Sequence, residues 1–85
     1  MAKHTPDAFM VIMRQDGQAL GFERGGGATV PFWSHDLGIA ERYAVPEDMP
    51  HPPWWYVGPH QRDLAKDAFM AIVQPSYDVV AKLVT

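Results

Sequence analysis

The sequence predicts a small α+β domain: an antiparallel sheet, made of an N-terminal three-stranded meander and a further strand near the C-terminus, packed by two helices. Two patterns lead to this prediction: strand-like apolar runs separated by glycine turns in the first third, and a helix-like apolar pattern after residue 60. The chain has 85 residues, of which 47% are hydrophobic and 20% charged. These values are typical of a chain that folds around one core, so we expect a single domain over residues 1–85.

The meander is expected within residues 9–32. Residues 9–15 begin with a run of apolar side chains and lead into Asp16-Gly17, a pair that supplies the positive φ angles of a hairpin turn. Residues 18–24 then form the second strand, and after three consecutive glycines residues 28–32 form the third. Pro31 cannot donate to a strand ladder, so the third strand lies at an edge of the sheet or ends there.

Two features near the N-terminus leave alternatives open. Thr5-Pro6-Asp7 is also a good start for a helix over residues 5–15, although we favour the strand. Residues 7–12 nearly recur as residues 67–72. Five identical positions out of six, without a longer period, are interpreted as a coincidence rather than a repeat.

The first helix is expected between Ser34 and Ala44. Ser34 can cap its N-terminus, and Asp36 lies where the helix dipole favours a negative charge. Pro46 forces the preceding residue out of helical geometry and so ends the helix. Five of the eight prolines fall within residues 46–59, which indicates an extended, polyproline-like loop.

The second helix is expected to end before Pro75. Its apolar side chains share one side at helical spacing, and charged side chains occupy the other. The apolar side comprises Leu64, Ala65, Ala68, Phe69, Ile72 and Val73. Residues 77–84 fit either a strand or a short helix, and their β-branched content favours the strand.

Composition excludes several classes of partner. The net charge is −3 and the lysines and arginines are scattered, so the sequence offers no basic face to neutralise phosphates. Cysteine is absent, and the apolar stretch at residues 8–13 is too short for a signal-peptide core or a membrane span. We therefore expect a cytoplasmic protein with no nucleic-acid partner and no membrane partner.

The segment from His51 to Tyr56 is the strongest candidate for a binding site. It reads His-Pro-Pro-Trp-Trp-Tyr, and prolines lower the entropy lost on binding while tryptophan and tyrosine offer large, rigid contact surfaces. We expect Trp33, Tyr43, His51, Trp54, Trp55 and Tyr56 to contact a partner. The alternative is that these rings fold back and cap a core too small to close by itself.

Catalytic and metal motifs are weak. Residues 32–36 contain the residue types of a hydrolase triad, but neighbours on one short stretch cannot align a nucleophile, a base and an orienting acid. Residues 23–29 are glycine-rich but lack the lysine and hydroxyl pair of a phosphate-binding loop. We expect no enzyme activity and no cofactor. The alternative is a small metal- or ligand-binding enzyme domain that uses His35, His51 and His60.

The stretch Val30-Pro31-Phe32-Trp33-Ser34, after a hairpin and before a segment containing Ala40, resembles the start of SseB-type bacterial domains. The resemblance covers roughly residues 9 to 45. This chain departs from that family by having Trp33 where threonine is usual and by its proline-aromatic loop. The resemblance implies a small mixed α+β fold and an accessory, non-catalytic role, and it transfers no site residues.

The function expected from these observations is a non-enzymatic protein-interaction module or inhibitor. Small bacterial or phage accessory proteins without catalytic groups act by occupying a surface on a larger partner, and inhibitors of the anti-CRISPR or other anti-defence type belong to this class. A structural homodimer subunit is the further alternative, because ten aromatic rings in so short a chain also favour self-association.

Overall fold

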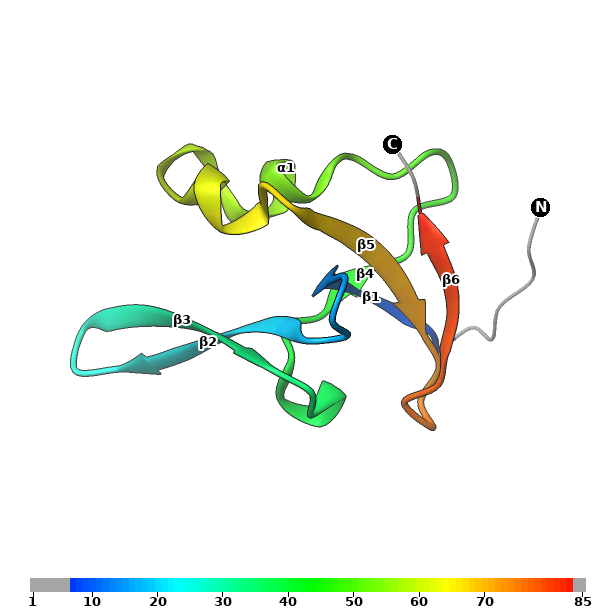
Figure 1. Ribbon diagram of the computed structural model, residues 1–85, viewed down its shortest axis with the longest axis horizontal. Helices are drawn as coiled ribbons and strands as arrows, with labels where there is room; N and C mark the ends of the chain where they lie inside the picture. The colour runs from blue at the N-terminus through cyan, green and yellow to red at the C-terminus, as the bar shows by residue number, and fades with distance from the viewer. Residues whose placement is uncertain (1–6, 84–85) are drawn as a thin grey trace.

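The fold is a six-stranded antiparallel sheet with a few helical turns, seen in a computed structural model that describes residues 7–83 (Figure 1). The strand order is β3-β2-β1-β5-β6, and β4 pairs with β1 beyond this path. The strands are β1 (Phe9–Arg14), β2 (Ala19–Gly25), β3 (Ala28–Ser34), β4 (Tyr43–Ala44), β5 (Ala68–Val73) and β6 (Val79–Leu83). The helical turns are η1 (Leu37–Ile39), α1 (Pro53–Val57) and η2 (Pro59–Ala65).

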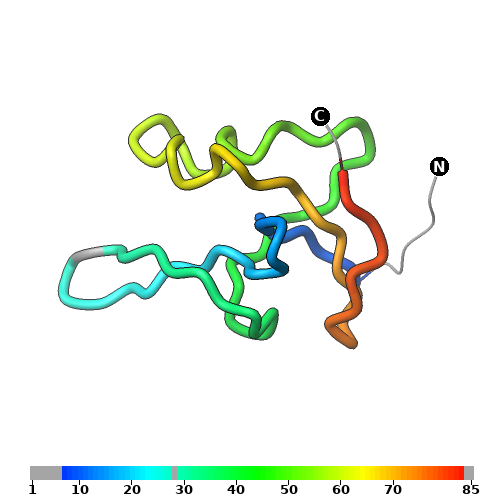
Figure 2. The backbone as a smooth tube through the Cα atoms, in the orientation of Figure 1, coloured from blue at the N-terminus to red at the C-terminus, as the bar shows by residue number. Residues whose placement is uncertain are grey.

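The N-terminal meander is confirmed. β1, β2 and β3 follow one another as antiparallel neighbours, and Gly17 has the positive φ of +89° that the first turn needs. Gly26 and Gly27, with φ of +57° and +79°, form the two-residue turn between β2 and β3. β3 lies at the edge of the sheet, as Pro31 requires. β2 and β3 leave the body of the molecule as a two-stranded arm (Figure 2).

The two similar segments of the chain lie side by side in the centre of the sheet. β1 and β5 pair antiparallel from Phe9↔Val73 to Arg14↔Ala68. The equivalent positions Val11 and Ala71 face each other directly. The recurrence has no longer period. The two similar segments nevertheless have the same environment, because both form central strands that are buried on both faces of the sheet.

The second expected helix, which was to end before Pro75, is wrong from residue 68 onward. Its N-terminal part is η2, and residues 68–73 form β5. A continuous apolar run satisfies helical spacing as well as it satisfies a strand buried on both faces, so the period alone cannot separate the two. Met70 and Ala71, which helical spacing places on the charged side, are both fully buried. The strand expected near the C-terminus is confirmed by β6, whereas residues 1–6 and 84–85 lie outside the described part of the chain.

The expected helix over residues 34–44 is also wrong, although its start signal has a local role. The Ser34 hydroxyl accepts from the Asp36 amide at 3.0 Å, and Asp36 caps the single turn η1 by accepting from the Gly38 amide at 2.9 Å. Beyond this turn the backbone bonds to the sheet instead: the Glu41 amide donates to the Leu20 carbonyl at 3.0 Å. Pairing of β4 with β1 then replaces the remaining helical hydrogen bonds.

The proline-rich segment departs from an extended loop at one point, where it forms α1. Pro53 occupies the first helical position, for which its fixed φ is suited, and Gly58 ends the helix at a φ of +84°. This short helix carries the three consecutive aromatic residues of the segment.

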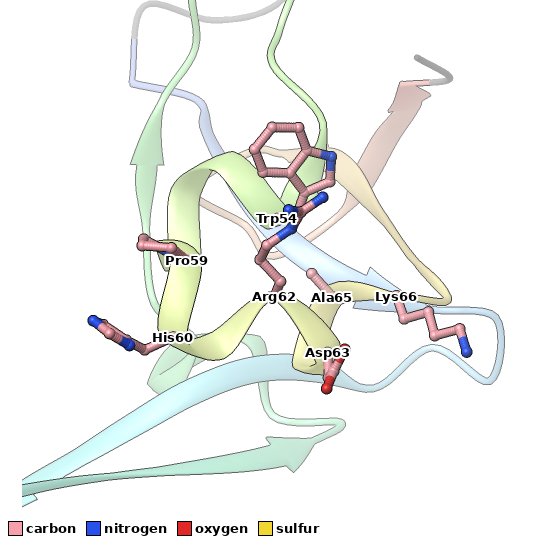
Figure 3. Close-up of a pocket in the computed structure, with 7 residues that line it drawn as sticks. All are labelled: Trp54, Pro59, His60, Arg62, Asp63, Ala65 and Lys66. Atoms are coloured by element: carbon pink, nitrogen blue, oxygen red, sulfur yellow. The ribbon is translucent and has the colours of Figure 1, made fainter.

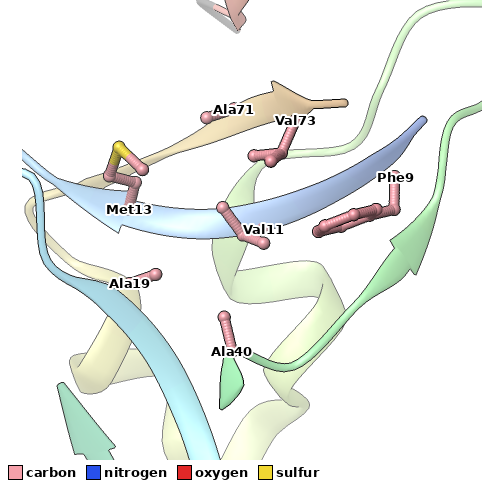
Figure 4. Packing of buried hydrophobic residues seen from close by; sticks show 7 residues of the cluster. All are labelled: Phe9, Val11, Met13, Ala19, Ala40, Ala71 and Val73. Atoms are coloured by element: carbon pink, nitrogen blue, oxygen red, sulfur yellow. The ribbon is translucent and has the colours of Figure 1, made fainter. Parts of the chain in front are cut away.

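Each face of the sheet carries a buried cluster. On one face the cluster around β1 and β5 is packed by Leu37 of η1, and Figure 4 shows its members. On the other face lie the buried side chains of Met10, Ile12, Leu20, Met70 and Ile72. Tyr43 of β4 and Tyr56 and Val57 of α1 pack against this second cluster, so α1 covers part of that face. Within residues 7–83, none of the helices has the length and apolarity to cross a membrane.

Candidate functional site

α1 presents three consecutive rings in different directions, because successive side chains on a helix are about 100° apart. Tyr56 packs against the buried cluster under α1. Trp54 and Trp55 stay at the surface, with 42% and 52% of their areas exposed. The core therefore takes only one of the three rings, and two indoles remain in contact with solvent.

Trp55 belongs to a row of rings that runs from the surface into the protein. The His51 ring stacks on Trp55 with centroids 4.0 Å apart and an interplanar angle of 13°. Tyr56 meets Trp55 edge-on at 5.2 Å, and Tyr43 packs against Tyr56 at 5.0 Å. The His51 amide also donates to the Tyr56 hydroxyl at 3.3 Å. We call these four residues the ring row; its contacts fix the orientation of the exposed indole of Trp55.

Trp54 lies on the other side of α1, against η2. The Arg62 guanidinium carbon is 4.6 Å from the centre of the Trp54 ring, a distance at which the cation and the ring attract each other. Figure 3 shows the hollow that this pair borders, a cavity of about 520 Å3. It is lined by Trp54, Pro59, His60, Arg62, Asp63, Ala65 and Lys66. Trp54 and Trp55 thus flank α1 with different surroundings, one polar and one aromatic.

Trp33 does not join this surface. The Arg14 guanidinium covers its ring at 4.3 Å, and the side chain packs against the buried cluster beside Leu20. The ring contacts found among residues 7–83 do not connect it to the ring row. The sequence predicted that Trp33 lies with the other candidate rings, but in the structure it lies apart from them.

Tyr43 is partly buried at the inner end of the ring row. Burial raises the pKa of its phenol to about 12, the Glu41 carboxylate raises it as well, and the Arg24 guanidinium opposes them. Glu41 is itself held by Arg24 in a two-pronged ion pair, with contacts of 2.6 and 3.2 Å, and this pair raises the pKa of Arg24. The phenol is thus held in its neutral form beside an ion pair.

A smaller cavity of about 200 Å3 opens between the β2–β3 arm and α1. Its lining joins Tyr43 and Tyr56 to residues that sequence reasoning missed: Phe22, Arg24, Thr29, Glu41, Val57 and Gln61. No linear pattern marks these positions, because the cavity exists only where the arm passes the turn of α1.

The histidines of the metal alternative do not come together. Among residues 7–83 there is no group of three or more His, Cys, Asp or Glu side chains that could hold a metal ion, so His35, His51 and His60 form no such site. Ser34 and Asp36 serve as hydrogen-bond acceptors for the turn at η1. The residue types of a hydrolase triad therefore have a local structural use.

The chain matches no protein-family model, no curated protein and no solved structure. The resemblance to SseB-type domains accordingly stays a prediction. A functional assignment has to come from the geometry of this surface.

Proposed function

We propose that the protein is a non-enzymatic interaction module that binds a protein partner through Trp54 and Trp55, with His51 and Tyr56 as their support. The observation that carries this proposal is the exposure of two neighbouring indoles, 42% and 52%, on a helix whose next residue is anchored in the core. Tryptophan is among the residues that most often dominate binding energy at protein interfaces.

The restricted conformation of these rings favours binding over a purely structural role. Pro52 and Pro53 restrict the backbone before α1, and the stacked His51 and the edge-on Tyr56 restrict the Trp55 ring. A side chain that is already ordered loses little entropy when a partner covers it. Rings needed only to close the core would be packed against the buried cluster, as Tyr56 is.

The partner is a larger protein, and inhibition by occupying its surface is the mode of action that we assign to a chain of this size. An inhibitor of a bacterial or phage defence system, of the anti-CRISPR type, is the specific form of this proposal. We also propose that the protein acts in the cytoplasm, with the accessory role that the SseB-type resemblance implies.

The test is capture of partners from the native host by the tagged protein and by the double variant Trp54→Ala/Trp55→Ala. We expect a partner that the natural protein retains and the double variant loses. Ile39→Ala is the matched control, because Ile39 is also exposed, at 54%, but lies in η1 on the other face of the sheet. Equal capture by all three proteins would contradict the proposal.

Circular dichroism has to accompany the capture, since lost binding is informative only for a folded variant. Both indoles lie outside the buried clusters, so the double variant is expected to keep its sheet. If it unfolds, the rings are structural and the alternative from the sequence is correct.

A homodimer is the second candidate, supported by a different observation. Val79 and Val80, 40% and 43% exposed, lie on β6 at an edge of the sheet. An exposed apolar edge strand can pair with the same strand of another copy. Light scattering over a range of concentrations tests it: a mass that doubles and that falls back in Val80→Lys supports the dimer, whereas a constant monomer mass excludes it.

A further inference from the structure

We propose that the free edge of β2, at Phe22 and Arg24, binds an extended segment of a protein partner as an added β-strand. The inference rests on the proposed function in taking the partner to be a protein, but it assigns a contact that does not use Trp54 or Trp55. It also states the chemistry of the partner: an extended segment without net charge.

The edge exists because β1 and β2 diverge after their turn. β2 pairs with β3 along its whole length, from Ala19↔Ser34 to Gly25↔Ala28, but with β1 only at Met13↔Ala19. Beyond Ala19, the side of β2 that faces away from β3 has no further strand partner among residues 7–83. The arm in Figure 1 is this two-stranded part of the sheet.

The direction of the backbone groups follows from two independent contacts. Pro31 lies opposite Phe22 and has no N–H, which requires Phe22 to turn its own N–H and C=O away from β3. The Leu20 carbonyl, two residues earlier, accepts from the Glu41 amide and therefore also points away from β3. Because these directions alternate along a strand, Arg24 shares them.

Two donors and two acceptors thus lie along the open edge of β2, in the spacing of a β-ladder. An extended backbone is the chemical group that matches such a row, as in peptides that add a strand to an exposed sheet edge. The Glu41 amide already makes the first bond of this kind, to Leu20, so an added strand continues a pairing that the chain itself begins.

The cavity supplies the side-chain contact that an added strand needs. It lies beside the edge and has a mixed lining: Phe22, Tyr43, Tyr56 and Val57 together with the polar side chains of Arg24, Thr29, Glu41 and Gln61. A volume of about 200 Å3 is below the roughly 300–1,000 Å3 of small-molecule sites, so it suits one side chain of a peptide better than a cofactor. The charges at the rim, Arg24 and Glu41, neutralise each other, which favours an uncharged segment.

Proline at position 24 tests the proposal with little effect on the ladder to β3, because the Arg24 N–H points to the open side. Arg24→Pro removes the outward donor, and Arg24→Ala is the matched control that loses the same ion pair but keeps the donor. The probe is a displayed library of random twelve-residue peptides, selected on the natural protein and then measured as synthetic peptides on the natural protein and on both variants.

We expect selected peptides to bind Arg24→Ala, to bind Arg24→Pro at least tenfold more weakly, and to slow hydrogen exchange of the Phe22 amide. Recovery of no peptide, equal binding to both variants, or protection of the β6 amides instead would overturn the proposal. If Arg24→Pro does not fold, exchange at Phe22 and Arg24 in the natural protein with the bound peptide decides the question. Trp54→Ala/Trp55→Ala keeps this edge, so binding of the selected peptides to that variant separates failure here from failure of the proposed function.

Discussion

Truncation of Met70 tests the placement of β5 at the centre of the sheet. Met70 is fully buried in the cluster that includes Met10, Ile12 and Leu20. Replacing a buried methionine by alanine removes its burial energy and leaves a cavity, which costs about 2–5 kcal/mol. For a domain of this size each kcal/mol lowers the melting temperature by about 4–8 °C, so a central value of about 3 kcal/mol corresponds to roughly 12–24 °C.

Leu64→Ala is the comparison that makes this measurement decisive. In the helical interpretation Leu64 faces the core and Met70 faces the charged side, whereas in the structure Leu64 is only partly buried on η2. Full burial of a leucine contributes about 1.5–3 kcal/mol, so partial burial predicts a loss of about 1 kcal/mol. Urea unfolding of the two variants gives both values. A larger loss for Leu64→Ala than for Met70→Ala would refute the argument.

Three further changes probe the local geometry. In Gly21→Ala the new Cβ lies 2.7 Å from Cε1 of Phe32 and closer still to Cζ, so we expect a loss of about 1–3 kcal/mol in denaturant unfolding, whereas Gly25→Ala in the same strand meets no atom within 4 Å and loses less. Gly58→Ala places a side chain at a φ of +84° and a ψ of 168°, which predicts a loss of about 1–3 kcal/mol in the same assay. The neutral phenol of Tyr43 is favoured in the folded state, so its stabilisation is present below the ordinary pKa of 10.0 and is lost as the pH rises to about 12. Urea midpoints across that window should fall more steeply in the natural protein than in Tyr43→Phe, and parallel curves would contradict the assignment.

The sequence was sufficient for the parts of the fold that depend on turn chemistry. Asp16-Gly17 and the glycines before Ala28 set the two turns of the meander, because few residues other than glycine adopt those φ angles. Pro31 restricted β3 to an edge for a reason equally local, the missing donor. These signals act within a few residues and need no knowledge of the rest of the chain.

The sequence was insufficient where a distant segment competes for the same backbone groups. Residues 40–44 have a good helix start before them, but β1 and β2 take their hydrogen bonds. Residues 68–73 have helical spacing, but β1 and β6 flank them as strands. The recurrence of residues 7–12 in 67–72 was the signal that could have identified both segments as neighbouring central strands.

The sequence identified only part of the candidate site, because local patterns do not show which distant segments come together. The segment from His51 to Tyr56 stood out by composition, and the structure places two of its rings at the surface. Local pattern could not separate Trp33, which Arg14 covers, from those rings. Nor could it find Phe22 and Arg24, since their free backbone groups result from the divergence of β1 and β2.

The most direct measurement is site-specific photocrosslinking in the native host, with benzoylphenylalanine in place of Trp55. We expect a discrete crosslinked protein from this position and none from the same probe at Ile39, where the exposure is similar but the residue lies on η1 and not on α1. Absence of a product at position 55, or the same product from both positions, would contradict the assignment of the indoles to a partner.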